Sequence, residues 1–238
     1  MATTGQSTPG SRLVSRVRPR LPAAMRTATL PSDDLADECS LTALRFEGLD
    51  LSSRTAGLVD IEGCRFEDAS LAGGRFDKLT VIDSAFERCD LANLSLGRSS
   101  LSRVELTGCR ATGLALGGVL LRHVTMRDCL ADLSIFRFAT LTRVEMVDCR
   151  LQGADFVSAD LSSAVFRRCD LTRAELSQAR AQGAVFVDCT WDGVRGVSSL
   201  AGATIVHGSP LDAHAFMVAT ASSLGIRLGD PADYLEDG

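Results

Sequence analysis

The sequence predicts an all-β solenoid of square cross-section, and two periodicities lead to this prediction. Every fifth residue of the 238-residue chain from Leu41 to Trp191 is apolar, which makes 31 consecutive positions with no change of register. A period of five fits neither an α-helix, with 3.6 residues per turn, nor a plain strand, with a period of two. It indicates a chain that turns every five residues and directs two side chains of each five inward.

A second period of 20 residues sets the length of one coil. Phe46, Phe66 and Phe86 are 20 residues apart, and six cysteines repeat at the same interval: Cys89, Cys109, Cys129, Cys149, Cys169 and Cys189. Four fives therefore make one coil, and equal side chains are expected to stack in ladders at the strand spacing of about 4.8 Å. We expect about eight coils and a rod roughly 37 Å long.

Three of the fives match a known consensus. ADFVS (154–158), ADLSS (159–163) and CDLTR (169–173) match the pattern A-(D/N)-L-x-x. On these motifs, residues 39–206 resemble the pentapeptide-repeat proteins. The resemblance implies a right-handed quadrilateral β-helix.

The two flanks lack the repeat. Residues 1–38 are rich in Ser, Thr, Pro and Arg and contain no apolar signal-peptide core. Such a start also resembles a transit peptide, but we expect a disordered basic tail. Residues 207–238 are expected to form a C-terminal helix and an acidic tail. The helix either covers the open end of the rod or makes a dimer contact, through the apolar residues Leu211, Phe216, Val218 and Ala219.

The composition excludes several classes of protein. A net charge of −5 and a pI near 5.3 argue against a general nucleic-acid-binding protein, and no apolar run is long enough to span a membrane. Eight cysteines are too few for a small disulfide scaffold. We expect them to pack in the core as reduced thiols, which suits the cytoplasm, rather than to form disulfides or bind a metal.

The sequence does not indicate catalysis. The three histidines, His123, His207 and His214, have no partner at a catalytic spacing, and the common phosphate-binding, nucleophile-elbow and zinc-protease motifs are absent. An unbroken β-helix also lacks the long loops that usually carry catalytic residues. We therefore expect no enzymatic activity, no cofactor and no metal.

The C-terminal region extends the family resemblance. The string AHAFMVATASSLGIRL resembles the ending of the gyrase-binding MfpA group, which dimerises through this region. This resemblance implies a DNA gyrase-binding protein that imitates DNA, protects gyrase from quinolones and forms a homodimer. The alternative is a generic protein-protein interaction scaffold with an unrelated partner.

Counting charges tests the idea of DNA mimicry. Residues 39–206 contain 21 acids and 19 bases, whereas duplex DNA of the same length would carry roughly 22 negative charges. One side of the predicted rod, which we call the acidic face, is richer in acids: Glu47, Glu67, Asp68, Glu87, Glu105, Asp128, Glu145, Asp148 and Asp188. Six arginines share that face, so a mixed-charge surface is favoured over mimicry by charge alone.

One group of outward residues is apolar. Within CLADLSIFRF, the pattern directs four large side chains away from the core, and we call them the apolar corner: Leu130, Leu133, Ile135 and Phe138. They form either a contact surface for a partner or a locally packed corner. Arg103, His123 and Arg143, also 20 residues apart, are expected to form a basic stripe elsewhere.

Overall fold

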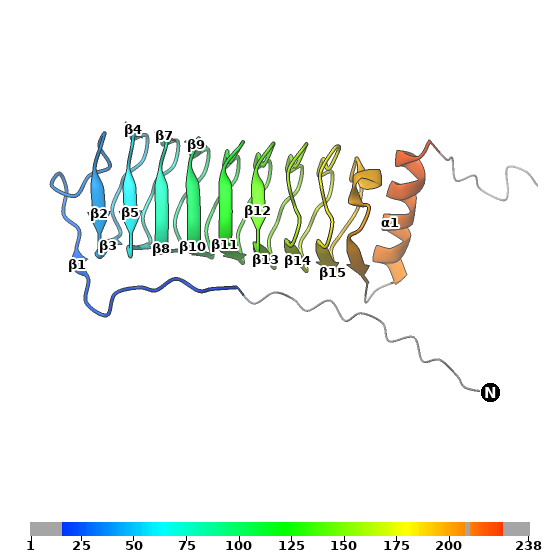
Figure 1. The fold of residues 1–238 in the computed structure, drawn as a ribbon, viewed down its shortest axis with the longest axis horizontal. Coiled ribbons are helices and arrows are strands. Elements are labelled where there is room, and N and C mark those ends of the chain that lie inside the picture. Colours follow the sequence, from blue (N-terminus) through cyan, green and yellow to red (C-terminus); the bar gives the residue numbers. More distant parts are fainter. Residues whose placement is uncertain (1–15, 208–209, 226–238) are drawn as a thin grey trace, which may run out of the picture.

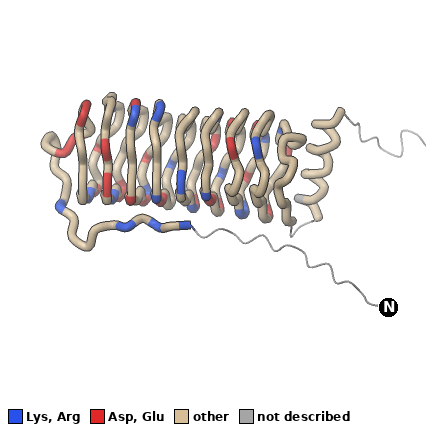
Figure 2. Tube along the Cα trace, in the orientation of Figure 1, with Lys and Arg blue, Asp and Glu red and all other residues tan. Residues whose placement is uncertain are grey.

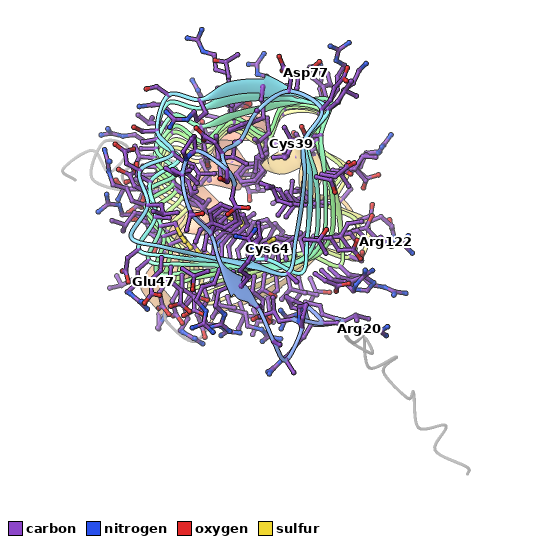
Figure 3. The ribbon with its side chains drawn as sticks, turned by 90° about the vertical axis from the view of Figure 1, so that its left-hand side faces the viewer. Arg20, Cys39, Glu47, Cys64, Asp77 and Arg122 are labelled. Atoms are coloured by element: carbon purple, nitrogen blue, oxygen red, sulfur yellow. The ribbon has the colours of Figure 1, made fainter. Side chains whose placement is uncertain are left out.

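The computed structural model describes residues 16–207 and 210–225, which form a straight rod of stacked coils with one helix across its C-terminal end (Figure 1). Viewed along its axis, the chain traces a square (Figure 3). The fold is the right-handed quadrilateral β-helix that the sequence predicts, with about nine turns. The predicted eight become nine because the ladder extends beyond Trp191 through one last, irregular turn.

The rod is built from short parallel strands. Their bounds are β1 (Arg26–Thr27), β2 (Ser40–Thr42), β3 (Leu44–Glu47), β4 (Thr55–Gly57), β5 (Asp60–Glu62), β6 (Arg65–Glu67), β7 (Arg75–Asp77), β8 (Thr80–Glu87), β9 (Ser95–Gly97), β10 (Ser100–Thr107), β11 (Leu120–Arg127), β12 (Thr140–Thr142), β13 (Glu145–Val147), β14 (Val165–Arg167), β15 (Val185–Val187) and β16 (Thr204–Val206). The chain also contains a 3-10 helix η1 (Val197–Leu200) and the α-helix α1 (Pro210–Ser223).

The strands pair in the predicted register of 20 residues. In the 13-stranded sheet, Phe46 pairs with Phe66 and Phe66 pairs with Phe86. A three-stranded sheet, β4-β7-β9, forms another side of the square. The remaining side is joined by single bridges such as Asp50 to Ser70. Each residue of a coil therefore lies directly beside the residue 20 positions later.

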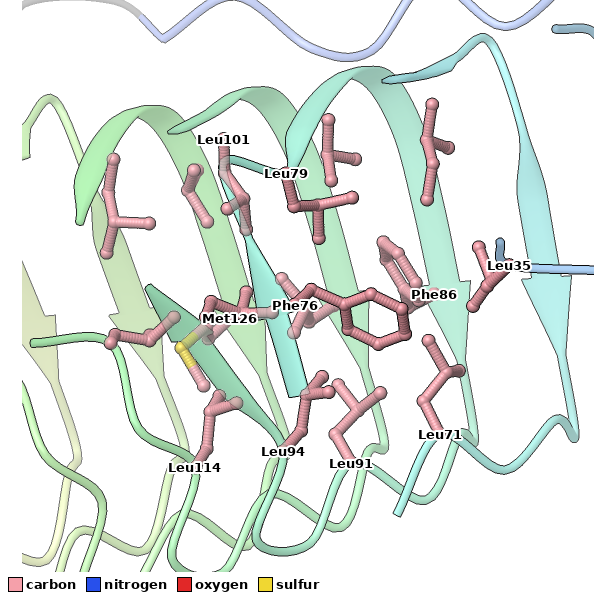
Figure 4. A pocket seen from close by; sticks show the side chains of 17 residues that line it. Leu35, Leu71, Phe76, Leu79, Phe86, Leu91, Leu94, Leu101, Leu114 and Met126 are labelled. Carbon is pink, nitrogen blue, oxygen red and sulfur yellow. The ribbon is translucent and has the colours of Figure 1, made fainter. Parts of the chain in front are cut away.

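The core confirms the inward pattern. All 31 positions of the five-residue column are buried, and phenylalanines stack face to face, with ring centroids 4.3 Å apart for Phe46 and Phe66 and 4.8 Å for Phe166 and Phe186. Each buried large apolar side chain stabilises the fold by roughly 1.5–3 kcal/mol. A narrow apolar cavity runs along the shaft. Most of its lining residues are leucines, and Phe76, Phe86 and Met126 also line it (Figure 4).

Each corner of the square is made by the residue two places after the central one. These residues have left-handed backbone torsions, for example φ 49° at Asp83, 55° at His123 and 57° at Leu133. For residues other than Gly, Asn and Asp, the left-handed conformation costs roughly 1–2 kcal/mol per residue. The corner side chains point away from the core, so they are available for contacts along the edges of the rod.

Helix α1 covers the C-terminal end of the stack. Trp191 is fully buried, and its ring makes edge contacts with Phe186, at 5.2 Å, and with Phe216 of α1, at 5.0 Å. The last strand, β16, pairs with β15 one residue out of the 20-residue register, since Phe186 faces Ile205. The regular coil therefore ends at the oversized Trp191, and the helix shields the unpaired edge that follows.

The structure corrects the expectation of disorder for residues 16–38. Residues 16–24, which we call the strap, lie extended along one edge of the rod (Figure 1). β1 then pairs with β3, and Ala28 and Leu35 are buried at the N-terminal end of the core. The strap is ordered because its backbone makes hydrogen bonds to corner side chains far away in sequence. Residues 1–15 lie outside the described part of the chain.

Candidate interaction surfaces

Most outward carboxylates of the rod are neutralised by an arginine one coil away. Arg88 binds Asp68 at 2.8 Å, and the same arrangement joins Asp90 to Arg110 at 2.7 Å. The Arg88 guanidinium lowers the pKa of Asp68 through its hydrogen bonds. Red and blue segments consequently intermingle along the rod (Figure 2). The surface carries many charges but little net charge.

The acidic face follows the same rule. Arg65 donates hydrogen bonds to Glu67 at 3.1 Å and to Glu87 at 2.9 Å, and Arg168 binds Asp148 at 2.6 Å. Glu145 is buried and is held by Arg167 and by Arg16 of the strap. Together with Asp68, five of the nine predicted acids are therefore compensated, and Asp188 also has an interaction partner. The other three form no ion pair with a described residue: Glu47, Glu105 and Asp128.

The apolar corner is exposed at all four predicted positions. Leu133 and Phe138 retain 64% and 66% of their accessible surface, and Leu130 and Ile135 retain 44% and 40%. Leu120, which the sequence pattern did not single out, is also exposed, at 57%. It lies two residues after Gly118, and Gly118 is stacked one coil below Phe138. Leu133 and Phe138 are the corner residues of two successive fives, so the group that we call the apolar corner spans two neighbouring corners of one coil, on a surface dominated by ion pairs.

The predicted dimerisation residues divide into two sets. Leu211 and Val218 are exposed, with Leu211 at 80%. Phe216 is half-buried against Trp191, and Ala219 is buried against the rod. Leu211 and Val218 also line a groove between α1 and the segment from Thr190 to Arg195. One set therefore attaches the helix to the rod, and the side chains of the other set are exposed to solvent.

The strap and the basic stripe form one polar seam. The Val17 amide donates a hydrogen bond to Nδ1 of His123 at 3.2 Å, and the Arg20 amide donates one to Asp83 at 3.0 Å. Arg103 binds both oxygens of Asp83, at 2.6 and 2.7 Å, and its hydrogen bonds lower the pKa of that carboxyl. Sequence patterning missed this seam because its contacts join residues about 60 to 110 positions apart.

The cysteines lie in the core. The six-rung ladder is 0–2% exposed, and its thiols donate to backbone carbonyls, as Cys89 does to Phe66 at 3.4 Å. Burial raises the pKa of the Cys64 thiol. All eight cysteines are free, and only Cys39 is half-exposed. Among the described residues, no group of three or more His, Cys, Asp or Glu side chains is placed to hold a metal ion.

This geometry defines a repeat protein of the β-solenoid class, in which every coil is one structural unit. The family described as "Pentapeptide repeat region" matches residues 59–136, and "Pentapeptide repeats (8 copies)" matches residues 134–173 and 149–188. The chain belongs to the pentapeptide-repeat family. A search of curated proteins gives no match. Within the described residues, no helix combines the length and apolar character needed to cross a membrane.

Two solved structures illustrate the similarity of fold. HetL, a pentapeptide repeat protein involved in heterocyst differentiation regulation in the cyanobacterium Nostoc sp. Strain PCC 7120, is 16% identical, with 72% of this chain and 87% of that chain covered and a TM-score of 0.42. A trypsin-treated form of QnrB1, a plasmid-mediated fluoroquinolone resistance protein, is 17% identical, with 81% and 100% covered and a TM-score of 0.38. With TM-scores below 0.5, neither structure informs the partner of this chain.

We expect at most one thiol to react in the native protein. Cys39 is half-exposed, whereas the other seven cysteines are buried, so a disulfide reagent such as dithionitrobenzoate should modify only Cys39 quickly. All eight should react in guanidinium chloride, and Cys39→Ser should abolish the fast phase. Two or more fast-reacting native thiols would contradict a purely structural ladder.

Docking of the strap should weaken in acid. Burial, followed by the charges of Arg143, Arg122 and Arg103, lowers the pKa of His123 below its ordinary 6.5. A released strap exposes His123 and leaves the three arginines in place, so the ring binds a proton more readily than in the docked state. Docking is therefore strongest above the pKa of the undocked ring and is lost as the pH falls toward the lower docked pKa. The loss is at most about tenfold per pH unit.

NMR shifts of the Val17 and Arg20 amides between pH 5 and 8 measure this equilibrium. His123→Gln removes the titrating group and should flatten the pH response. A transition of equal size in that variant, or stronger docking at low pH, would show that His123 does not control the strap.

Proposed function

We propose that this protein is a non-catalytic binding protein that docks a protein partner on the apolar corner, and that DNA gyrase is the partner to test first. The observation that supports this proposal is the exposure of the four corner residues. Elsewhere the outward residues of the rod are largely paired charges, small residues or polar residues. Leu58 and Leu120 also depart from that pattern, but the apolar corner brings four such side chains together in one coil.

The chemistry of the corner suits a protein interface. Its large side chains offer apolar area at the centre, and they are flanked by charged pairs, Asp132 with Arg150 and Asp155 with Arg137. Protein interfaces combine an apolar centre with a polar rim in this way, and a few central side chains usually supply most of the binding free energy.

Net charge alone gives little support to DNA mimicry, because most acids of the acidic face are compensated. Gyrase is proposed because the C-terminal sequence resembles that of the MfpA group, and the rod has no loop inserted between fives. Asp128, which forms no ion pair with a described residue, precedes Leu130 by two residues and offers a charge contact beside the apolar anchor. If the protein does not bind gyrase, the alternative proposal is that it is a scaffold for an unrelated protein partner.

The double variant Leu133→Asp with Phe138→Asp should weaken binding to purified gyrase by about 100-fold, which corresponds to about 3 kcal/mol and is ordinary for two central interface residues. It should also lose inhibition of supercoiling and protection from quinolones. Leu58→Asp is the matched control, because Leu58 occupies the same corner column as Phe138, is 50% exposed and has a similar φ of 60°.

Two outcomes would overturn parts of this proposal. Equal binding by the double variant and the wild type would exclude the apolar corner as the docking site. If micromolar wild-type protein neither binds gyrase, nor inhibits supercoiling, nor protects it from a quinolone, then gyrase is not the partner.

We also propose a homodimer through the outer side of α1. Its support is the exposed pair Leu211 and Val218 beside a groove at the end of the rod. Leu211→Asp should convert a dimer to a monomer in size-exclusion chromatography with light scattering. Met217→Asp is the control on the same helix, since Met217 is 52% exposed and does not line the groove. A monomeric wild type would refute the dimer, and a dimeric Leu211→Asp would refute this interface.

A further inference from the structure

A small pocket lies where the strap crosses the basic stripe. Its lining residues come from both segments: Val17, Arg20, Ser102, Arg103, Arg122 and His123. Figure 3 shows Arg20 and Arg122 near the same corner of the square. The pocket is therefore built by the strap and the rod together, and it exists only while the strap is docked.

The positive charges around this pocket exceed the negative charges. Asp83 contacts two residues of the pocket, but Arg103 occupies both of its oxygens, and the Arg20 backbone amide adds a third hydrogen bond. The guanidinium groups of Arg20 and Arg122 form no ion pair with a described residue. Arg143 adds another cation, with its Nη1 3.5 Å from Nε2 of His123.

Most arginines elsewhere on the rod are neutralised, so the unpaired ones require an explanation. Arg88, Arg110 and Arg180, for example, each bind an aspartate exactly one coil away. The residues one coil before Arg122 and His123 are Ser102 and Arg103, neither of which is acidic. Glu62 acts on Arg103 at longer range. Four guanidinium groups near the pocket thus face two carboxylates, which leaves an excess of two positive charges.

His123 adds a polar wall and no charge. Its Nδ1 accepts the Val17 hydrogen bond, so in the neutral ring Nε2 carries the proton. Ser102 contributes a hydroxyl to the lining. The pocket therefore offers arginine guanidinium groups and a serine hydroxyl as hydrogen-bond donors, and Asp83 is the one carboxylate at its border. This set of donors suits an oxyanion.

We propose that this pocket binds a phosphate group, as inorganic phosphate or as a phosphate monoester, through Arg20, Arg122 and Ser102. Guanidinium forks match the oxygens of phosphate in a bidentate manner, and a dianion offsets the excess charge. Because the strap supplies Arg20, a bound phosphate stabilises the docked strap, and docking increases the affinity for phosphate by the same factor. The ligand thus acts as a clamp between the strap and the rod.

Hydrogen exchange of the strap in the full chain tests this linkage. At constant ionic strength, phosphate at ten times its Kd should slow exchange at the Val17 and Arg20 amides by about tenfold. Adenosine monophosphate forms a second arm. Slowing by both ligands identifies the phosphate group itself, and slowing by only one identifies free phosphate or a monoester as the ligand.

Two variants make the test specific. Arg122→Gln should abolish the slowing, since it removes an unpaired guanidinium and leaves the strap hydrogen bonds to His123 and Asp83 in place. Arg173→Gln removes an exposed arginine outside the pocket and should preserve it. Equal slowing by sodium chloride at the same ionic strength, undiminished slowing in Arg122→Gln, or no slowing by either phosphate ligand would overturn the proposal.

Discussion

The stacking of each residue on the residue 20 positions later is the constraint on which the rest of this structure depends. Backbone hydrogen bonds fix successive coils at strand spacing, about 4.8 Å, so any side chain has a defined neighbour above and below. Inside the square, this places Phe66 between Phe46 and Phe86. Outside it, the same constraint places Arg88 over Asp68 and Arg168 over Asp148.

This constraint limits what the surface can recognise by charge. Like charges stacked directly on neighbouring strands destabilise a sheet, and the column of Glu47, Glu67 and Glu87 is tolerated with Arg65 placed between two of them. A long uncompensated acidic ladder would thus weaken the rod that displays it. Recognition by side chains that break the repeat, such as Leu133 and Phe138, carries no such electrostatic penalty.

The features that repeat could be predicted from the sequence, and those that occur once could not. The inward column and the 20-residue register follow from periodicity, and all 31 side chains from Leu41 to Trp191 in that column are buried where the pattern predicts. The pairing of Asp68 with Arg88 could also have been predicted from the same interval. The strap could not, because the contacts of Val17 with His123 and of Arg20 with Asp83 depend on folding of coils distant in sequence.

The strap nevertheless obeys the period of the rod. Val17 and Arg20 are three residues apart, and their partners His123 and Asp83 are 40 residues, or two coils, apart. Two coils span about 9.6 Å, and three residues of polyproline II span about 9.3 Å and complete one turn. Pro19 and Pro22 favour that conformation. The three-residue repeat of an extended, proline-containing segment therefore matches the distance between corners two coils apart. Strap residues three positions apart can thus contact equivalent corner positions on every second coil.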